Sequence, residues 1–407
     1  MKSIAVIGGG ITGVTTAYAL VRRGFAVTLI ERHRYPAMET SFANGGQLSA
    51  SHAESWNHWR TVAKGLRWMT RRDAPLLINP TPTWHKLSWF AEFLAAMPGY
   101  RMTTVDTTRL ALAAREHLFA WAEEEGIDFD LQRRGILHIY RDRAGFEDAV
   151  AVSRLLGEGG LVRRAVTPGE MRVIEPALQG HYHGGFYTDS DASGDIHKFT
   201  TGLALALERR GARCRYGDEV TALAAGDDGV EVRYAGEGES NHEKFDGIVI
   251  CGGTGSRKLA AMLGERVNVY PVKGYSITVM LGDDASRRAA PQVSLVDDAA
   301  KLVASRFGDD RLRVAGTAEF NGANYDIRAE RIAPLVAWVQ RCFPEVQTRS
   351  VIPWAGLRPT MPAMYPAVRA GRAPGVFYNT GHGHLGWTLA AATAEMTGGL
   401  VAGALLR

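Results

Sequence analysis

The chain of 407 residues contains only three cysteines, Cys214, Cys251 and Cys342, and none of them forms a CxxC pair. This spacing argues against a disulfide framework and a zinc site and is typical of a protein of the reducing cytoplasm. No stretch approaches the ~18 consecutive apolar residues of a membrane-spanning helix, so no transmembrane segment is predicted. The apolar run at the N-terminus is too short for a signal peptide, because three glycines follow it at once. We therefore expect a cytoplasmic protein.

The chain also lacks a large excess of either charge, since 47 Lys and Arg against 43 Asp and Glu leave a net charge of +4. The basic residues are dispersed along the chain, which argues against a nucleic-acid-binding surface. Glycine, in contrast, is abundant: 46 residues are about one in nine, against a usual share of roughly 7%. No repeat contains this excess, so we expect tight turns and close approaches of the backbone to a ligand.

The N-terminus carries a complete nucleotide-binding pattern. Residues 3–7 form a short apolar run, Gly8-x-Gly10-x-x-Gly13 follows, and a predicted helix ends at Gly24. A second apolar run, 26–30, ends at Glu31, 21 residues after Gly10. This order predicts a Rossmann-like unit whose glycine turn approaches a pyrophosphate and whose acidic residue accepts ribose hydroxyls. The expected cofactor contacts here are Gly8, Gly10, Ile11, Thr12, Gly13, Glu31 and Arg32.

The next segment, ETSFANGGQLS at 39–49, is similar to the ETSFANAGQ-like loop of the D-amino acid dehydrogenase and glycine oxidase group within the D-amino acid oxidase family. The blocks 191–223, 245–260, 271–278 and 354–362 also resemble segments of that family. The resemblance implies FAD as the cofactor, with backbone contact from Val220 to adenine and a diphosphate near Gly252, Gly253 and Ser256. It places five further residues beside FAD: Ser41, Asn44, Gly45, Gly46 and Gln47. No cysteine falls in a block beside the flavin ring, so we expect non-covalent FAD.

The resemblance also implies the fold class: α/β (α+β overall), with a Rossmann-like FAD-binding domain interleaved with a sheet-based substrate domain, as in D-amino acid oxidase and glycine oxidase. Residues 1–90, 185–265 and 350–407 would form the FAD-binding domain, and residues 91–184 and 266–349 the substrate domain. The apolar segment 74–100 is open to three interpretations: a core-facing helix that joins the domains, which we favour, a lid over the pocket, or a membrane-surface patch.

Arg358 in WAGLRPTMP is the main catalytic candidate, because a guanidinium makes a bidentate pair with a carboxylate and so orients an amino acid. The resemblance places Arg358 over the flavin. Tyr275 is the second candidate, as a hydroxyl donor to the substrate or as a half-buried strand residue. We interpret Lys273 as a strand-end charge and expect the block of Asp195 and His197 to be structural. Tyr325 is a weaker candidate for the pocket wall.

The C-terminal stretch GHGHLGWT, 381–388, precedes a smooth helical pattern. Its two histidines supply too few ligands for a metal ion, so we predict no metal site. We expect His382 to be structural and His384 to be a pocket-wall residue. The helix N-terminus would lie at the flavin and stabilise its reduced, negative form. The residues expected near the cofactor are Gly383, His384, Leu385, Gly386, Trp387 and Thr388.

The predicted function is oxidation of the C–N bond of a small amino acid by hydride transfer to FAD, with hydrolysis of the imine product. Two departures from the family favour an unusual substrate such as an N-substituted glycine: the bulky residues 361–366 after Arg358 and His384 in place of a smaller residue. An NAD-dependent dehydrogenase and a flavin monooxygenase are disfavoured. A non-catalytic FAD-binding subunit and a quinone-linked dehydrogenase at a membrane surface stay as alternatives. Oxygen and quinone are both open as electron acceptors, and a homo-oligomer is compatible with the sequence.

Overall fold

The N-terminal nucleotide-binding pattern folds as its sequence indicates. The computed structural model describes residues 1–68, 74–236 and 239–406. Strand β1 (Ser3–Ile7) leads through the glycine turn into helix α1 (Ile11–Val21), and the chain returns in strand β2 (Ala26–Glu31). The two strands are parallel, with Ile7 opposite Ile30. Their apolar side chains are buried on both faces, as expected for an inner parallel pair.

A six-stranded sheet grows from this unit, in the order β19-β20-β13-β1-β2-β9. Its further strands are β9 (Arg213–Tyr216), β13 (Gly247–Ile250), β19 (Ala367–Ala370) and β20 (Val376–Thr380). One face packs against the helices α1, α4 (Tyr100–Glu125), α7 (Ile196–Arg209) and α11 (Gly386–Leu405). The other face packs against a three-stranded antiparallel sheet of β10 (Glu219–Gly226), β11 (Gly229–Gly236) and β12 (Glu239–Phe245). The result is a layered α/β unit.

A nine-stranded mixed sheet forms the other half of the molecule, in the order β18-β14-β17-β16-β15-β5-β7-β6, with β4 paired to β17. The strands are β4 (Leu76–Ile78), β5 (Ile136–Tyr140), β6 (Arg164–Val166), β7 (Gly184–Thr188), β14 (Tyr270–Met280), β15 (Ser294–Asp297), β16 (Leu302–Phe307), β17 (Arg311–Phe320) and β18 (Val351–Thr360). Helix α10 (Ala329–Cys342) packs on its outer face through Leu335, Trp338 and Val339.

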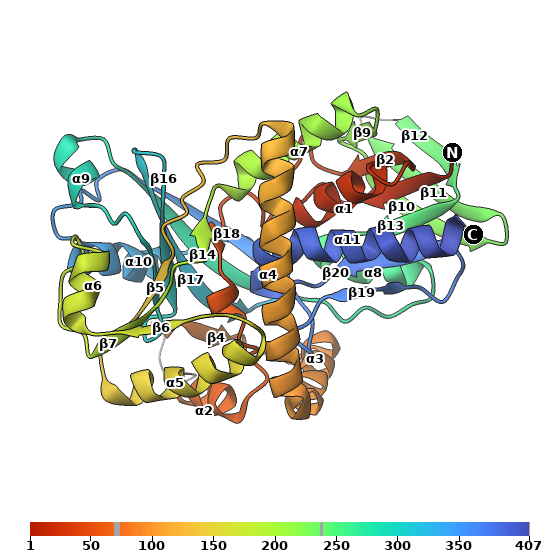
Figure 1. Cartoon of the computed structure of the whole chain (residues 1–407). Coiled ribbons are helices and arrows are strands. Elements are labelled where there is room, and N and C mark those ends of the chain that lie inside the picture. The colour runs from red at the N-terminus through yellow and green to blue at the C-terminus, as the bar shows by residue number, and fades with distance from the viewer. Residues whose placement is uncertain (69–73, 237–238, 407) are drawn as a thin grey trace.

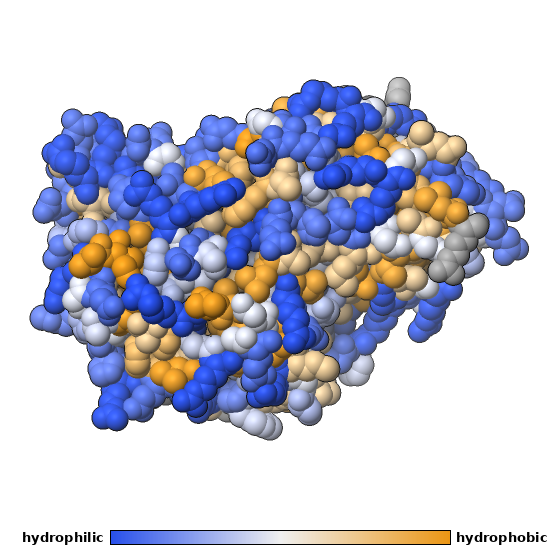
Figure 2. Space-filling model, in the orientation of Figure 1, coloured by the Kyte–Doolittle hydropathy of each residue, from blue (hydrophilic) through white to orange (hydrophobic). Residues whose placement is uncertain are grey.

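Figure 1 shows α4 standing between the two halves, with α1 and α11 running from beside α4 toward the end of the six-stranded half, where both chain termini lie. The smaller helices α2 (Trp59–Trp68), α3 (Trp84–Ala95), α5 (Arg143–Glu158), α6 (Pro168–Ile174), α8 (Ser256–Met262) and α9 (Asp284–Ala289) lie around this frame. Hydrophilic residues cover most of the face shown in Figure 2, with apolar patches between them. Among the described helices, none is long and apolar enough to cross a membrane.

Two elements differ from the segment boundaries expected from the sequence. Strand β18 lies within the segment assigned to the FAD-binding domain, yet it pairs with β14 over its whole length in the nine-stranded sheet. Helix α4 lies within the segment assigned to the substrate domain, yet Ala114, Leu118 and Trp121 pack into the core beside α1 and α11. The two-domain division stays a prediction. The contacts of α4 would move its boundary near residue 91, and the pairing of β18 would move its boundary near residue 350.

Candidate active site

One cavity of about 1150 Å³ collects nearly all of the predicted site residues. It is lined by the first glycine turn, the loop 39–47, the end of β13 and the start of α11, together with residues of the nine-stranded sheet. Small-molecule sites usually enclose about 300–1,000 Å³. The cavity therefore has the size expected for a large ligand with a second, smaller one beside it.

The glycine turn at residues 8–13 admits no side chain at two positions. Gly8 has φ +115°, and a Cβ there would lie 2.6 Å from the carbonyl oxygen of Cys251. A Cβ at Gly13 would lie 1.7 Å from the carbonyl oxygen of Gly8, so this glycine permits close packing of helix on strand and does not itself line the cavity. Helix α1 has neither a side-chain cap nor an acidic residue in its first turn. Its N-terminus is thus suited to an anion.

Glu31 ends β2 at the edge of the cavity, where its carboxylate is held by two backbone amides. Gly9 N–H and His33 N–H both donate to it, the second at 2.8 Å. Arg32 lines the same end and pairs with Glu39. Tyr325 donates to Glu39 at 3.1 Å and lies outside the cavity lining, so the prediction that it forms part of the pocket wall is wrong.

The loop 39–49 is held through its backbone carbonyls by side chains of the nine-stranded sheet. Ser276 donates to the carbonyl of Ala43 at 2.7 Å, and Ser305 donates to that of Gly45 at 2.8 Å. Arg313 donates to the carbonyl of Asn44 at 3.1 Å. Four consecutive residues of this loop, Asn44, Gly45, Gly46 and Gln47, line the cavity. The conformation of the loop thus depends on the neighbouring sheet.

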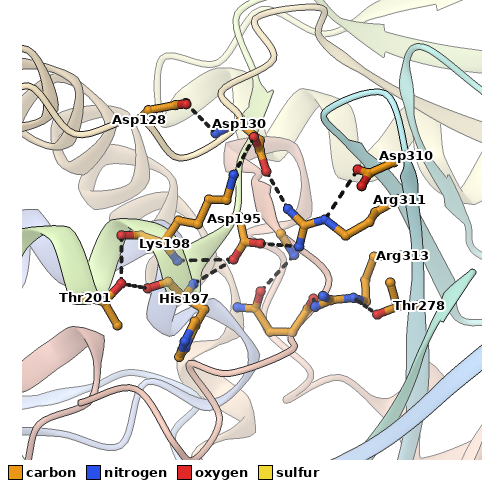
Figure 3. Close-up of polar contacts among 12 residues, drawn as sticks. Asp128, Asp130, Asp195, His197, Lys198, Thr201, Thr278, Asp310, Arg311 and Arg313 are labelled. Carbon is orange, nitrogen blue, oxygen red and sulfur yellow. Dashed lines mark hydrogen bonds and ion pairs between the residues drawn. The ribbon is translucent and has the colours of Figure 1, made fainter. Parts of the chain in front are cut away.

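Behind this loop, a cluster of charged residues joins the two halves (Figure 3). Arg311 of β17 pairs with Asp130 and, at 2.8 Å, with Asp195. Asp195 also caps α7 by accepting from the backbone N–H of His197 at 2.9 Å. Arg313 donates to the Thr278 hydroxyl at 2.7 Å, and burial lowers its pKa to about 10. His197 packs edge-on against Phe42 and takes no part in the cavity lining, in line with the structural role expected for it.

At the far wall, the predicted contacts from β10 and β13 divide into two groups. Val220, Gly252 and Gly253 line the cavity. Ser256 does not: it is fully buried, its hydroxyl lies 2.8 Å from that of Thr380, and the prediction that it approaches a diphosphate is wrong. Ser256 begins helix α8, and its side chain lies buried beneath Gly252.

Arg358 projects from β18 into the cavity beside a bare stretch of β14. Its Nη1 donates to the carbonyl of Thr317 at 2.7 Å, and its Nη2 lies 3.5 Å from the carbonyl of Gly316. The guanidinium lies over Gly274, where a Cβ would come within 2.3 Å of Nη2. Burial lowers the pKa of Arg358 to about 10. Among the described residues no carboxylate is within ion-pair distance of it, so the cavity holds an arginine that lacks a counterion.

Tyr275 lines the cavity, but its hydroxyl has partners on the side of Glu319, so its role as a donor to the substrate stays a prediction. Because successive side chains of a strand face opposite sides, Gly274 faces Arg358 and Tyr275 faces α10. The Tyr275 hydroxyl lies 3.3 Å from Glu319 Oε2 and 3.3 Å from the carbonyl of Asp326. Lys273 shares that face. It is fully buried and donates to Asn324 Oδ1 at 2.7 Å, so it is no strand-end surface charge.

The two histidines of the C-terminal turn have different environments. His382 is buried, its Nε2 lies 3.0 Å from the Thr393 hydroxyl, and burial lowers its pKa to about 4. His384 lines the cavity and stacks on Trp56 with ring centroids 4.7 Å apart. Burial lowers the pKa of His384 well below its usual value. Among the described residues, no group of three side chains could hold a metal ion.

The sequence analysis missed the segment that follows the loop 39–49. His52, Glu54 and Trp56 alternate with buried residues and line the cavity beside His384. Glu54 accepts from the Tyr100 hydroxyl at 2.7 Å, and burial raises its pKa. Next to His52, His138 of β5 lies 2.9 Å from the Ser51 hydroxyl, and burial lowers the pKa of His138 to about 3. The two histidines and the glutamate within the seven residues 52–58 were the available signal.

The segment 74–100 is largely the core-facing element that the sequence favours. Trp89 and Phe93 of α3 are buried against Tyr270 and Phe320. The opposite face of the helix leaves Trp84 and Leu87 exposed.

Comparison with known proteins identifies the family. The family model for FAD-dependent oxidoreductases of the DAO type matches residues 3–400. The chain belongs to this family of FAD-dependent oxidoreductases. D-amino acid dehydrogenase 3 of Mesorhizobium japonicum is 60% identical over 402 residues, which cover 99% of this chain and 97% of the relative. D-amino acid dehydrogenase of Dechloromonas aromatica is 40% identical, over 98% of this chain and 97% of the relative.

Solved structures of the same DAO-type fold are similar over nearly the whole chain. Glycine oxidase from Geobacillus kaustophilus has a TM-score of 0.77 at 20% identity and covers 98% of this chain and 95% of its own. Iminodiacetate oxidase from a Chelativorans species has a TM-score of 0.71 at 21% identity, with coverage of 98% and 95%. The predicted fold class, a Rossmann-like α/β unit with a second sheet in the glycine oxidase arrangement, is thus confirmed.

The residues of the cavity fit FAD as the cofactor of this family. The turn at Gly8 and Gly13 leaves no room for side chains, and the N-terminus of α1, whose Ile11 N–H donates to the cavity-lining Ser41 at 3.0 Å, lies beside it. In the loop 39–47, Gln47 has a buried Oε1 without a hydrogen-bond donor among the described residues. A ligand with phosphates at one end and N–H groups at the other satisfies both features.

Proposed function

We propose that the protein is an FAD-dependent dehydrogenase of small D-amino acids, which converts the amino acid to an imine that water hydrolyses to a 2-oxo acid and ammonia. The observation that carries the proposal is the counterion-free Arg358 in the cavity. A buried cation without a partner is costly unless a ligand supplies the anion. The curated relatives support this substrate class, since D-amino acid dehydrogenase is the name they carry.

Arg358 would bind the substrate carboxylate through the N–H groups that its two carbonyl partners leave free. The carbonyl of Thr317 and the bare surface of Gly274 fix the guanidinium from two sides. His52, Trp56 and His384 would form the wall against which the substrate side chain packs. Bound FAD supplies the acceptor for the hydride that leaves the substrate Cα. The protein's contribution is then orientation of the Cα–H bond and exclusion of water.

We propose non-covalent attachment of FAD, held by the glycine turn, Glu31, the loop 39–47 and the start of α11. Of the three cysteines, only Cys251 lines the cavity. Burial raises its pKa to about 12, which keeps the thiol protonated and unreactive. Release of intact flavin into the supernatant on acid or heat denaturation would agree with this proposal, and flavin that stays with the precipitated protein would contradict it.

Anaerobic flavin reduction tests the proposed activity directly. Purified protein is mixed with D-alanine, D-methionine, D-proline and their L-enantiomers, and bleaching of the flavin absorbance is followed. We expect reduction by D-enantiomers only. Arg358→Ala should slow flavin reduction at low D-amino acid concentration by at least ~100-fold, because a charge-assisted pair is lost and the orientation of the substrate with it. Arg209→Ala, at a surface pair with Glu125, is the matched control and should react like the wild type. Equal rates for Arg358→Ala and wild type would refute the proposal.

Glycine and N-substituted glycines are the second candidate class. The stacked rings of His384 and Trp56 line the same cavity as Arg358, and two such large side chains in its wall would favour a substrate without a bulky side chain on Cα. N-methylglycine and N-ethylglycine therefore belong in the same assay. Higher kcat/KM for these than for every D-amino acid would favour the second class. The electron acceptor is determined in a second step, in which the reduced enzyme is mixed with oxygen or with a soluble quinone and the rates of flavin reoxidation are compared.

A further inference from the structure

Thr317 has an unusual backbone conformation at the centre of the site. Its φ is +60°, and of the five non-glycine residues with positive φ among those described, it is the one with a β-branched side chain. Such a conformation costs about 1–3 kcal/mol and persists only where its surroundings impose it. Residues of this kind cluster at functional sites. Thr317 lines the cavity next to Arg358.

The cause of this conformation is a β-bulge between β14 and β17. Lys273 pairs with Glu319 and Tyr275 pairs with Gly316, so Gly274 alone faces both Thr317 and Ala318. The extra residue turns the backbone at Thr317, the position that glycine usually occupies in a bulge with left-handed φ. The bulge directs the Thr317 carbonyl toward Arg358, which donates to it at 2.7 Å. The strained residue therefore holds the guanidinium.

The Thr317 hydroxyl is buried and has no hydrogen-bond partner among the described residues. Hydroxyl groups in protein interiors are almost always hydrogen-bonded, because an unpaired one costs about 1–3 kcal/mol. A glycine in this bulge would avoid both the strain and the unpaired hydroxyl. A hydrogen bond from the Thr317 hydroxyl to a ligand would explain why a threonine occupies this position.

We propose that Thr317 is a substrate-binding residue: its carbonyl positions Arg358, and its hydroxyl donates a further hydrogen bond to the substrate carboxylate. The inference rests on the proposed function, in which Arg358 binds that carboxylate. Together the two residues would give the carboxylate three donors, two from the guanidinium and one from the hydroxyl. Three donors fix the plane of the carboxylate. With the guanidinium alone, the carboxylate could still rotate about the axis that joins the two groups.

Binding of propionate, a carboxylate without an amine, tests the proposal apart from turnover. The dissociation constant is measured from the change in flavin absorbance in the holoenzyme, and FAD affinity is measured separately. Thr317→Val keeps the shape and removes the hydroxyl, so we expect propionate to bind on the order of 10-fold to 100-fold more weakly. Thr317→Ser keeps the hydroxyl and should bind within about threefold of wild type. FAD affinity should be unchanged in both.

The outcomes separate this inference from the proposed function. Propionate binding by Thr317→Val equal to wild type overturns the inference, as does weakened FAD binding with unchanged propionate binding, which would assign the hydroxyl to the cofactor. If Thr317→Val fails to fold, Thr317→Gly serves instead, since it relieves the strain and keeps the carbonyl. A wild-type enzyme that no D-amino acid reduces, yet that binds propionate through Thr317, overturns the proposed function alone.

Discussion

Gly274→Ala is the most direct way to displace Arg358 without touching its charge. A Cβ at residue 274 would lie 2.3 Å from Nη2, 2.4 Å from Cζ and 2.6 Å from Nη1 of Arg358. Ordinary contacts need about 3.5 Å, so the guanidinium has to withdraw by about 1 Å. Gly274 lies in the middle of β14 and has no positive φ, so alanine itself is compatible with the backbone.

The withdrawal would break the 2.7 Å hydrogen bond to the Thr317 carbonyl and move the carboxylate-binding face. A misplacement of about 1 Å costs on the order of 100-fold in rate when orientation is the main catalytic device. We therefore expect kcat/KM for D-alanine to fall about 100-fold in steady-state turnover with an artificial electron acceptor, with FAD content unchanged.

Gly403→Ala is the matched control. Residue 403 lies in α11 with no atom within 4 Å of a built Cβ. The substitution should leave reduction kinetics unchanged and raise stability by up to about 1 kcal/mol, because alanine favours a helix over glycine. A Gly274→Ala enzyme with full FAD content and kcat/KM within threefold of wild type would refute the assignment of Arg358 as the carboxylate anchor.

Three further predictions concern the cofactor turn, the pH dependence of stability and the charged cluster. Gly13→Ala should abolish FAD retention and lower the melting temperature, because its Cβ would lie 1.7 Å from a carbonyl oxygen; a yellow, equally stable variant would contradict this. His382 has a folded-state pKa of about 4 against 6.5 unfolded, so the unfolded state binds more protons and stability is lost as pH falls from 6.5 to 4, by about 3 kcal/mol. Urea denaturation should show a flatter pH profile for His382→Gln, and a parallel profile would exclude the buried neutral imidazole. Asp195→Asn should keep the N-cap of α7 and lose the ion pair with Arg311, whereas Asp195→Ala should lose both. By calorimetry, the alanine variant should be about 1 kcal/mol less stable than the asparagine variant. Equal stability of the two variants would exclude a stabilising cap.

Local patterns predicted the cofactor half of the site well. The strand, glycine turn, helix and acidic residue at 3–31 are consecutive in the chain, so their spacing alone determines how they meet. The loop 39–47 and the C-terminal turn were identified by resemblance, and both line the cavity. Arg358 was chosen from its neighbours in sequence, and the structure places it in the same cavity.

The substrate half was predicted less well, because its geometry depends on strand pairing. Tyr275 and Lys273 were expected at the site or at a strand end, but the face of a strand that meets the cavity is decided by its partners. The bulge opposite Gly274 involves residues more than 40 positions away, Thr317 and Ala318, and no local pattern marks it. His52 and Glu54 were missed for a similar reason, since their segment has no regular structure of its own beyond a short turn.

Ser276, Ser305 and Arg313 of the nine-stranded sheet hold the loop 39–49. The nine-stranded sheet therefore cannot be exchanged without affecting the cofactor site. A chimaera that exchanged the nine-stranded sheet to change substrate preference would also replace the side chains that shape the flavin loop. The flavin affinity of the chimaera would then depend on the exchanged sheet as well as on the nucleotide-binding half. Domain exchange in such proteins must carry these three donors across, or the new substrate pocket will face an empty cofactor site.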